Sequence, residues 1–381
     1  MKETLSKWNT AVQTGIRRAN AYVASHKRMV LAVCLLVMIL FTALKYEIYD
    51  ETAFTSAYRT MTAVNTGDFS GGDAAFSATA SVFHALFSWI GNISMRGWAW
   101  LLLVPGAAVF LWILAKAPAL NLFSALTALG FSFLLPYFVF MPGVDFLQYL
   151  LFFVMALILI YVPGQIPKLI GCELVLLPVV LFLREYYVLM MIGAAVLFGV
   201  AILYRKPKTL GAQTLFLGIL ASGVILALLL LRVAAPDLTD RLFSIRTRIN
   251  MGFESMPAPD KLILDLLPMD WSVAGFIVNF LFAAVRILIP VELCVNFSDI
   301  PFAVFQILLD ILILIELVRS RRVSARTAAY SVIIAFFLMS FCFEPSFGSW
   351  FRHEAAAFPI LWLGIGMDRE THLLPEGKQN G

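Results

Sequence analysis

Three groups of ionisable residues stand at the ends of apolar runs, where they are placed to bind or react with a substrate. The first is Tyr49-Asp50-Glu51, which directly follows the first apolar run. A carboxylate at a membrane surface can remove a proton from an attacking hydroxyl, or hold a divalent ion on a phosphate. Acidic residues also border membrane loops without any chemical role, so both interpretations stay open for Asp50 and Glu51.

The second group is Leu183-Arg184-Glu185-Tyr186-Tyr187, between two apolar stretches. A guanidinium in an apolar turn is costly unless it is paired, and its fork of N–H groups matches a phosphate. Glu185 would balance Arg184 when no ligand is bound; a local Arg-Glu pair without any ligand is the alternative. Tyr187 and its neighbour are either interfacial aromatics or a platform on which a sugar stacks.

The third group is Arg352-His353-Glu354, the densest ionisable cluster in the chain. Successive helical residues point about 100° apart, so at most two of the three can face one ligand. We expect these two to be Arg352 and His353. Glu354 has an alternative role as an acid in the first turn of a helix, where it suits the dipole.

A fourth basic set lies in the irregular stretch 232–301. Arg241, Arg246 and Arg248 precede Pro257 and Pro259. This pattern indicates a lid over a site rather than a separate domain, and we expect the three arginines to contribute to anion binding.

Composition assigns these groups to a membrane protein. Of the 381 residues, 61% are hydrophobic and 14% charged, against roughly 45–50% and about 25% in soluble domains. Apolar runs of about 20 residues recur, which is the length that crosses a bilayer. We predict an all-α polytopic bundle. The formal charge of +4 does not indicate nucleic-acid binding, because Lys and Arg stand mostly at the ends of these runs.

The positive-inside rule predicts ten spans with both termini cytoplasmic. Residues 1–28 form a basic, amphipathic cytoplasmic segment, 29–367 the transmembrane catalytic domain and 368–381 a cytoplasmic tail. Outer segments cover 47–96 and 232–301, and we favour an interfacial or re-entrant helix within 273–300. The predicted spans are 29–46, 98–115, 123–140, 146–162, two within 169–204, 211–231, 302–318, 330–343 and 355–367.

The acidic pair after the first span, the arginine-centred turn and the Arg-His before a final span together resemble bacterial lipid-linked sugar enzymes. These are the Wzy-type and EpsG-type repeat-unit polymerases and, more broadly, the GT-C class of integral glycosyltransferases. In that resemblance Asp50 and Glu51 match the acid of GT-C enzymes, and Arg184 and Arg352 match the paired arginines of the polymerases. Two features depart from it: His353 replaces the usual tyrosine, and GT-C enzymes usually have more spans and a soluble outer domain.

The resemblance implies transfer of sugar from a polyprenyl phosphate or diphosphate at the outer leaflet of the bacterial cytoplasmic membrane. Its partners would be a polyprenyl-linked donor and acceptor, membrane lipid and proteins of a polysaccharide assembly system. The sequence specifies no cofactor, although Asp50 and Glu51 are compatible with a divalent metal. The alternatives are a transporter or flippase of an anionic lipid-linked glycan, and a scaffold subunit. The candidate catalytic residues are Asp50, Glu51 and His353, and the candidate substrate-binding residues are Arg184, Glu185, Tyr187, Arg241, Arg246, Arg248 and Arg352.

Overall fold

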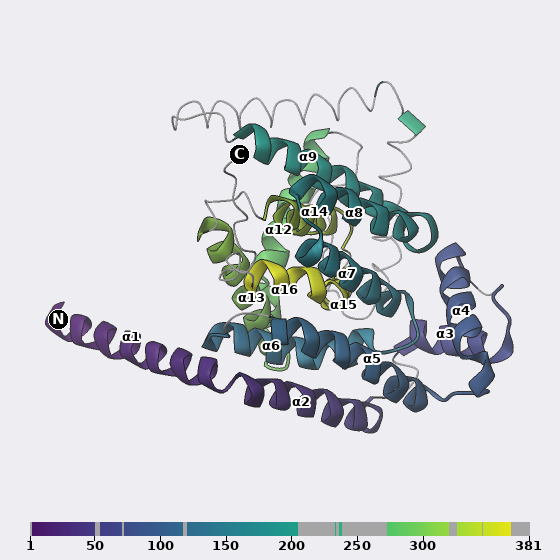
Figure 1. Ribbon diagram of the computed structural model, residues 1–381, viewed down its shortest axis with the longest axis horizontal. Helices are drawn as coiled ribbons and strands as arrows, with labels where there is room; N and C mark the ends of the chain where they lie inside the picture. The colour runs from purple at the N-terminus through teal and green to yellow at the C-terminus, as the bar shows by residue number, and fades with distance from the viewer. Residues whose placement is uncertain are drawn as a thin grey trace, which may run out of the picture. The chain divides into compact units, whose positions relative to one another are not determined.

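The computed structural model describes residues 2–49, 54–70, 72–116, 120–204, 233, 236–237, 273–319, 326–344 and 346–366. Within these residues the regular structure is entirely helical (Figure 1), which confirms the predicted all-α membrane bundle. Eight helical segments of this part of the chain are long and apolar enough to cross a membrane. They are Lys27–Ile48, Met95–Lys116, Leu122–Val139, Val144–Tyr161, Gln165–Leu183, Glu185–Leu203, Ala274–Cys294 and Ile300–Leu317.

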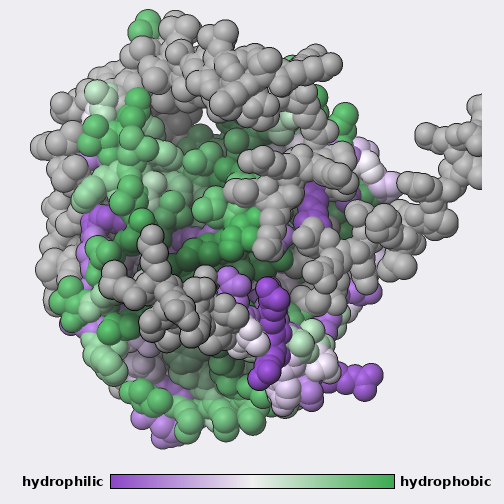
Figure 2. Space-filling view, turned by 90° about the vertical axis from the view of Figure 1, so that its left-hand side faces the viewer, coloured by the Kyte–Doolittle hydropathy of each residue, from purple (hydrophilic) through white to green (hydrophobic). Residues whose placement is uncertain are grey.

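Hydrophobic side chains cover much of the described surface on the face that Figure 2 shows. Leu174 and Leu181, for example, are 64% and 62% exposed on a predicted span. A soluble domain rarely exposes apolar patches of this extent, whereas lipid is a suitable neighbour for them. The protein is therefore a multi-pass membrane protein.

The chain divides into two compact units, each described by itself. The first comprises residues 1–160, 308–325 and 352–381, and the second 161–307 and 326–351. The chain passes from one unit to the other after residues 160, 307, 325 and 351, and two of these points lie inside the helices α13 (Ile300–Arg319) and α15 (Phe347–Ala356).

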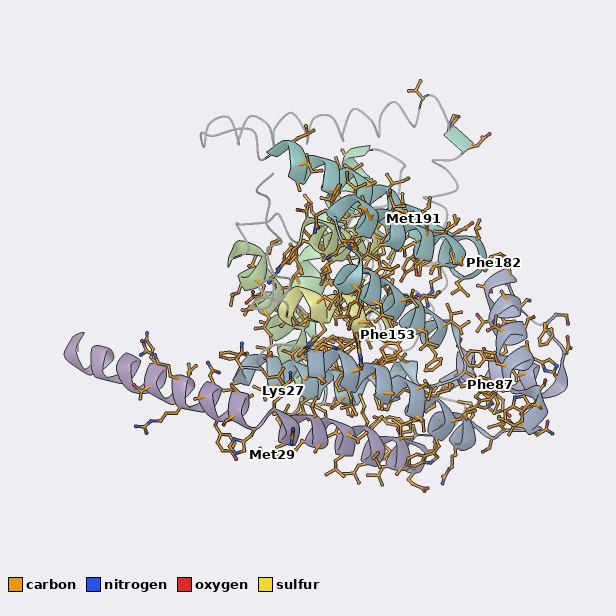
Figure 3. The ribbon with its side chains drawn as sticks, in the orientation of Figure 1. Lys27, Met29, Phe87, Phe153, Phe182 and Met191 are labelled. Atoms are coloured by element: carbon orange, nitrogen blue, oxygen red, sulfur yellow. The ribbon has the colours of Figure 1, made fainter. Side chains whose placement is uncertain are left out.

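The first unit begins with two successive helices, α1 (Lys2–Ser25) and α2 (Lys27–Ile48), which meet at His26. The His26 ring stacks on Tyr22 with 4.0 Å between centroids. Lys27, labelled in Figure 3, donates from Nζ to the carbonyl of Ala115 at 2.7 Å. The amide of Leu122 donates to Oδ1 of Asn20 at 2.9 Å. The predicted helical start of the chain is thus tied to the bundle, while its place in the headgroup layer stays a prediction.

A helical hairpin occupies the segment predicted to lie outside. It consists of α3 (Thr55–Thr66) and α4 (Ala74–Phe87), followed by the short helix η2 (Ser88–Ile90). Asp73 caps α4 by accepting a hydrogen bond from the amide of Phe76 at 2.8 Å. Gly67 ends α3 with a φ of 72°, which is a left-handed conformation that favours glycine.

Three further membrane helices complete the first half of this unit. They are α5 (Met95–Lys116), α6 (Leu122–Leu134) with the π-helical turn η3 (Leu135–Val139), and α7 (Val144–Tyr161). α2 packs against both α5 and α6 (Figure 1). Phe41 of α2 contacts Phe133 of α6 with 4.5 Å between ring centroids. Trp112 of α5 meets Phe153 of α7, labelled in Figure 3, edge to face at 5.4 Å.

Gly106 allows the end of η3 to approach α5 closely. A Cβ at Gly106 would lie 2.3 Å from Cε1 of the buried Phe140 ring. The Gly106 carbonyl also accepts a hydrogen bond from the Tyr149 hydroxyl at 2.9 Å. The turn from Phe140 to Tyr149 therefore depends on the missing side chain.

The second unit is built around α14 (Thr327–Phe343), which packs most extensively on α9 (Val188–Tyr204). Ala335 of α14 approaches Gly193 of α9 so closely that a Cβ there would lie 3.3 Å from the alanine Cβ. Its other elements are α8 (Gln165–Pro178), the π-helical turn η4 (Val179–Leu183), the short helix η5 (Glu185–Tyr187), α12 (Val273–Leu288) and η7 (Val291–Cys294). The predicted pair of spans within 169–204 is confirmed, and Phe182, labelled in Figure 3, lies 59% exposed beside their turn.

The predicted final span, 355–367, is not one regular helix in the structure. The structure breaks it at Ala357, between α15 and α16 (Phe358–Gly366), where Pro359 lacks an N–H to continue the ladder. At about 1.5 Å per residue, the nine residues of α16 cover only part of the hydrocarbon thickness, so the crossing by 355–367 stays a prediction. Side chains from His353 to Ile365 are buried throughout, which is typical of an internal helix rather than of one facing lipid.

Two other predicted membrane segments remain predictions. The span 211–231 lies outside the described residues. The stretch 273–300 contains α12 and η7, and its part Ala274–Cys294 has the length and composition for a full crossing, so re-entry stays a prediction. The total of ten spans also remains a prediction.

Gly106→Ala is expected to lower the free energy of unfolding by about 1–3 kcal/mol, because the added methyl group must displace Phe140. Unfolding of the purified protein in mixed micelles measures this loss. Gly199→Ala is the matched control, since a Cβ at Gly199 would meet no atom within 4 Å, and it is expected to be neutral or slightly stabilising. Equal stability of both variants would contradict the prediction.

Candidate functional site

The carboxylate of Asp145 is the centre of a charged cluster in the first unit. Nε of Arg352 lies 3.3 Å from Oδ2 of Asp145, and Nε2 of His353 lies 3.9 Å from Oδ1. The side chains of Asp145 and His353 are 14% and 7% exposed, and that of Arg352 is 35% exposed. One carboxylate oxygen thus faces a guanidinium and the other an imidazole, in a site that is mostly closed to solvent.

Asp145 is held by the start of α7. It lies in the first turn of that helix, where the free amide groups and the helix dipole favour a negative charge. The neighbouring aromatic residues Phe140, Phe146 and Tyr149 are buried. Because the Tyr149 hydroxyl bonds the Gly106 carbonyl, α5 fixes the helix that carries the carboxylate.

Arg352 and His353 come from α15 and reach the same group, as the spacing argument predicted for two of the three adjacent residues. Their roles toward a substrate stay predictions. Glu354 is completely buried, and it lies in the last turn of α15. The alternative role of Glu354 as a first-turn cap is therefore wrong, since the helix begins seven residues earlier than it at Phe347.

The arrangement provides both parts of an acid–base and anion-binding site. A guanidinium that is one-third exposed can bind a phosphate oxygen, and a carboxylate or imidazole beside it can accept a proton. An anion that bonds Arg352 would compete with Asp145 for the same N–H groups. Loss of that ion pair would leave the carboxylate available to accept a proton.

Asp145 is the residue that sequence reasoning missed. It lies between two predicted spans that end at 140 and begin at 146, in a short connection that carried no recognised motif. The available signal was an acid immediately before an apolar run, on the same predicted side of the membrane as Arg352. Only the packing of α15 on the start of α7 makes it a partner of Arg352 and His353.

The Arg184 turn belongs to the second unit. Arg184 joins η4 to η5 in an extended conformation, with φ −153° and ψ 96°. Its amide donates to the Val179 carbonyl at 2.7 Å. One guanidinium nitrogen, Nη1, donates to the Tyr186 hydroxyl at 3.2 Å, and the Tyr186 ring lies 5.3 Å from that of Phe343 at the end of α14. The turn is therefore anchored to α14 by aromatic contact.

The neighbours of Arg184 do not take the places that we expected. Glu185 is exposed and forms no ion pair with the described part of the chain, so the predicted balance between Glu185 and Arg184 is absent there. Tyr187 is fully buried, and its ring is covered rather than presented for sugar stacking. The Tyr186 hydroxyl is one partner of the guanidinium.

Several predicted site residues lie outside the described residues. These are Asp50, Glu51, Arg241, Arg246 and Arg248. Arg184 and Arg352 belong to different compact units, and their joint action on one ligand stays a prediction. In the described residues, no group of three or more His, Cys, Asp or Glu is arranged to hold a metal ion.

A fully buried lysine, Lys45, joins the end of α2 to η3. Its Nζ donates to the Pro136 carbonyl at 2.8 Å and lies 4.9 Å and 5.3 Å from the ring centroids of Tyr46 and Phe54. A carbonyl dipole and aromatic faces thus surround the amine and favour its protonated form. It also stands in the last turn of α2, where the helix dipole favours positive charge. Sequence position alone indicated only a basic residue at the border of a span.

Comparison with known proteins gives no relative: the chain matches no protein-family model, no curated protein and no solved structure significantly. Function must accordingly be argued from the residues and their geometry.

The Asp145–Arg352 pair is expected to stabilise the fold more than an exposed pair does. A double-mutant cycle with Asp145→Asn and Arg352→Gln should give a coupling energy of about 1–2 kcal/mol, reduced from that of a fully buried pair by the exposure of Arg352. The matched control is Glu47→Gln with Arg96→Gln, a shorter pair at 2.8 Å whose side chains are 60% and 53% exposed. Its coupling should stay below about 0.5 kcal/mol. A larger coupling in the control would count against the buried site.

Lys45→Ala is expected to reduce the free energy of unfolding by about 2–4 kcal/mol, through a cavity and a lost hydrogen bond. Lys45→Met keeps most of the stem volume and should cost less. The control is Lys116→Ala, an exposed lysine at the end of α5, with an expected effect within about 0.5 kcal/mol. Unfolding in mixed micelles compares the three; an unaltered Lys45→Ala variant would refute the structural role.

Proposed function

We propose that the protein is a membrane glycosyltransferase or repeat-unit polymerase that uses polyprenyl-(di)phosphate-linked sugars at the outer leaflet to build a cell-surface polysaccharide. The observation that carries this proposal is the Asp145–Arg352–His353 cluster at the end of a membrane helix. We place the protein in the bacterial cytoplasmic membrane with both termini in the cytoplasm. In that topology, the start of α7 and the residues before α16 lie on the outer side.

The proposed reaction joins an acceptor hydroxyl to the anomeric carbon of the donor sugar. A bond forms between the hydroxyl oxygen and that carbon, and the bond from the carbon to the carrier phosphate oxygen breaks. The hydroxyl loses its proton and the phosphate leaves with the bonding electron pair. Arg352 would bind the phosphate and stabilise this developing charge.

The proton would pass to the Asp145 carboxylate or to His353. In the structure, the Asp145 carboxylate is paired with Arg352. Binding of the carrier phosphate to Arg352 would release the carboxylate from this ion pair and leave it able to accept the hydroxyl proton. The same ion pair would therefore keep the site inactive until a phosphorylated carrier is present.

Two chemical roles remain for the residues predicted from the sequence. Asp50 and Glu51, as the acids after the first span, would assist the acceptor or hold a divalent ion. Arg184, Arg241, Arg246 and Arg248 would bind other parts of the carrier or glycan. The proposal requires only that Arg352 and Asp145 act on the reacting groups.

Reconstitution into proteoliposomes with a synthetic polyprenyl diphosphate oligosaccharide tests the proposal. Wild-type protein should lengthen the lipid-linked glycan, as measured by mass spectrometry. Arg352→Ala and Asp145→Asn should each reduce the rate by at least about 100-fold, and Arg352→Lys should retain part of it. Lys116→Ala, matched in charge change and remote in predicted topology, should behave as wild type.

Two results would overturn the proposal. One is an unchanged rate in both the Arg352→Ala and Asp145→Asn variants, provided that they elute and unfold as wild type does. The other is transfer of the labelled lipid across the bilayer without any lengthening, which would identify the protein as a transporter of the anionic glycan.

A further inference from the structure

The helix α4 and the η2 turn that follows it present an exposed apolar face. Val82, Leu86, Trp89 and Ile90 are 41%, 56%, 80% and 43% exposed. Val82 and Leu86 are four residues apart and so share one side of α4, and Trp89 and Ile90 follow in η2. The side of α4 that faces the protein is apolar as well, and its Phe83 is buried. Both the buried side and the exposed side of α4 are therefore hydrophobic.

The partner helix in the hairpin has the reverse character. The exposed side chains of α3 include Arg59, Thr62 and Thr66. Arg59 covers the Phe76 ring of α4, with its Cζ 4.3 Å from the ring centroid, so the charged residue lies at the border between the two helices. The hairpin has one polar and one apolar surface.

The loop between α3 and α4 is adapted to water. The hydroxyl and amide of Ser70 donate to Oδ1 of Asp68 at 2.6 Å and 3.0 Å. These hydrogen bonds lower the pKa of the Asp68 carboxyl, which keeps this exposed group ionised near neutral pH. An ionised carboxylate must remain outside the hydrocarbon region.

The chain from Ala74 to Ser94 contains no Asp, Glu, Lys or Arg. Its helical part, Ala74–Ile90, is apolar but shorter than the segments that can span. A crossing is also incompatible with α3, because a polar helix packed along α4 would have to enter the hydrocarbon with it. If the hairpin lies in the plane of the membrane interface, the apolar α4 contacts lipid and the polar α3 stays in water.

We propose that α4 and η2 lie in the membrane interface as a non-spanning helix, with Val82, Leu86, Trp89 and Ile90 inserted among the lipid chains and α3 toward water. The partner of this face is the lipid bilayer. The next helix along the chain, α5, is a membrane-spanning segment whose Trp100 and Val104 are 42% and 72% exposed. Trp89 has the amphipathic ring that is enriched at this depth.

The inserted helix also determines the surroundings of Asp145. On the protein side of α4, the Phe83 ring lies 6.3 Å from that of Phe146, the residue after Asp145. Phe87, labelled in Figure 3, and Phe83 both contact Trp98 edge to face, at 5.2 Å and 5.5 Å. The start of α7 is thus joined through α4 to the headgroup layer. If the proposed function holds, this is the depth at which a carrier phosphate would meet Arg352.

Spin labelling in nanodiscs tests the inserted helix without requiring activity. Single cysteines replace Leu86 or Trp89 in a protein whose four native cysteines are changed to alanine, and collision rates with oxygen and with a water-soluble nickel chelate are measured. Asp68→Cys and Thr62→Cys are the aqueous controls, and Val104→Cys is the lipid control. We expect the nickel accessibility of labels at 86 and 89 to be at least about fivefold below that at 68, and their oxygen accessibility to match that at 104.

Nickel accessibility at 86 and 89 equal to that at 68 would overturn the proposal. Dipolar broadening of the label at 89 that disappears on dilution with unlabelled protein would overturn it in favour of a second copy of the chain.

Hydroxyl-radical footprinting of the unmodified protein in nanodiscs gives an independent measurement. Trp89, although more exposed than Tyr58 (80% against 42%), should be oxidised less, and greater oxidation of Trp89 would contradict insertion. None of these outcomes depends on sugar transfer.

Discussion

An ionised side chain that leaves water must find opposite charge or oriented dipoles, and this constraint shapes the charged interior of the protein. Asp145 meets it with Arg352, His353 and the start of α7. The buried Lys45 amine donates to the Pro136 carbonyl and lies beside two aromatic rings. In both places a polar group joins two helical elements near their ends.

The same constraint explains how packing supports the candidate site. The carboxylate is positioned only if α7 starts at the right place against α5, which depends on the space left by Gly106 and on the hydrogen bond from Tyr149. The Arg184 turn is supported differently, through Tyr186 and its contact with Phe343. Arginine is suited to both places because several N–H donors allow it to keep a protein partner and bind a ligand.

The hairpin of α3 and α4 connects the charged site with the membrane. Its apolar face suits lipid, its polar face suits water, and Phe83 packs beside the helix turn that carries Asp145. An enzyme that acts on lipid-anchored phosphates needs its reactive groups at headgroup depth. A helix that lies in the interface beside the site would set that depth, because its insertion is favoured by apolar area and opposed by the charge of α3.

The sequence by itself determined the class of the protein, because long apolar runs can satisfy their backbone in lipid only as helices. It also identified Arg352 and His353, whose adjacency limits which side chains can face one group. Only the tertiary structure decided that Asp145, some 200 residues earlier in the chain, is the partner of Arg352 and His353. It also decided that the Tyr187 side chain is buried. It also decided that the last predicted span breaks at Ala357. Hydrophobic periodicity reports the local environment of each segment, whereas the partners of a buried charge depend on which distant helix packs against it.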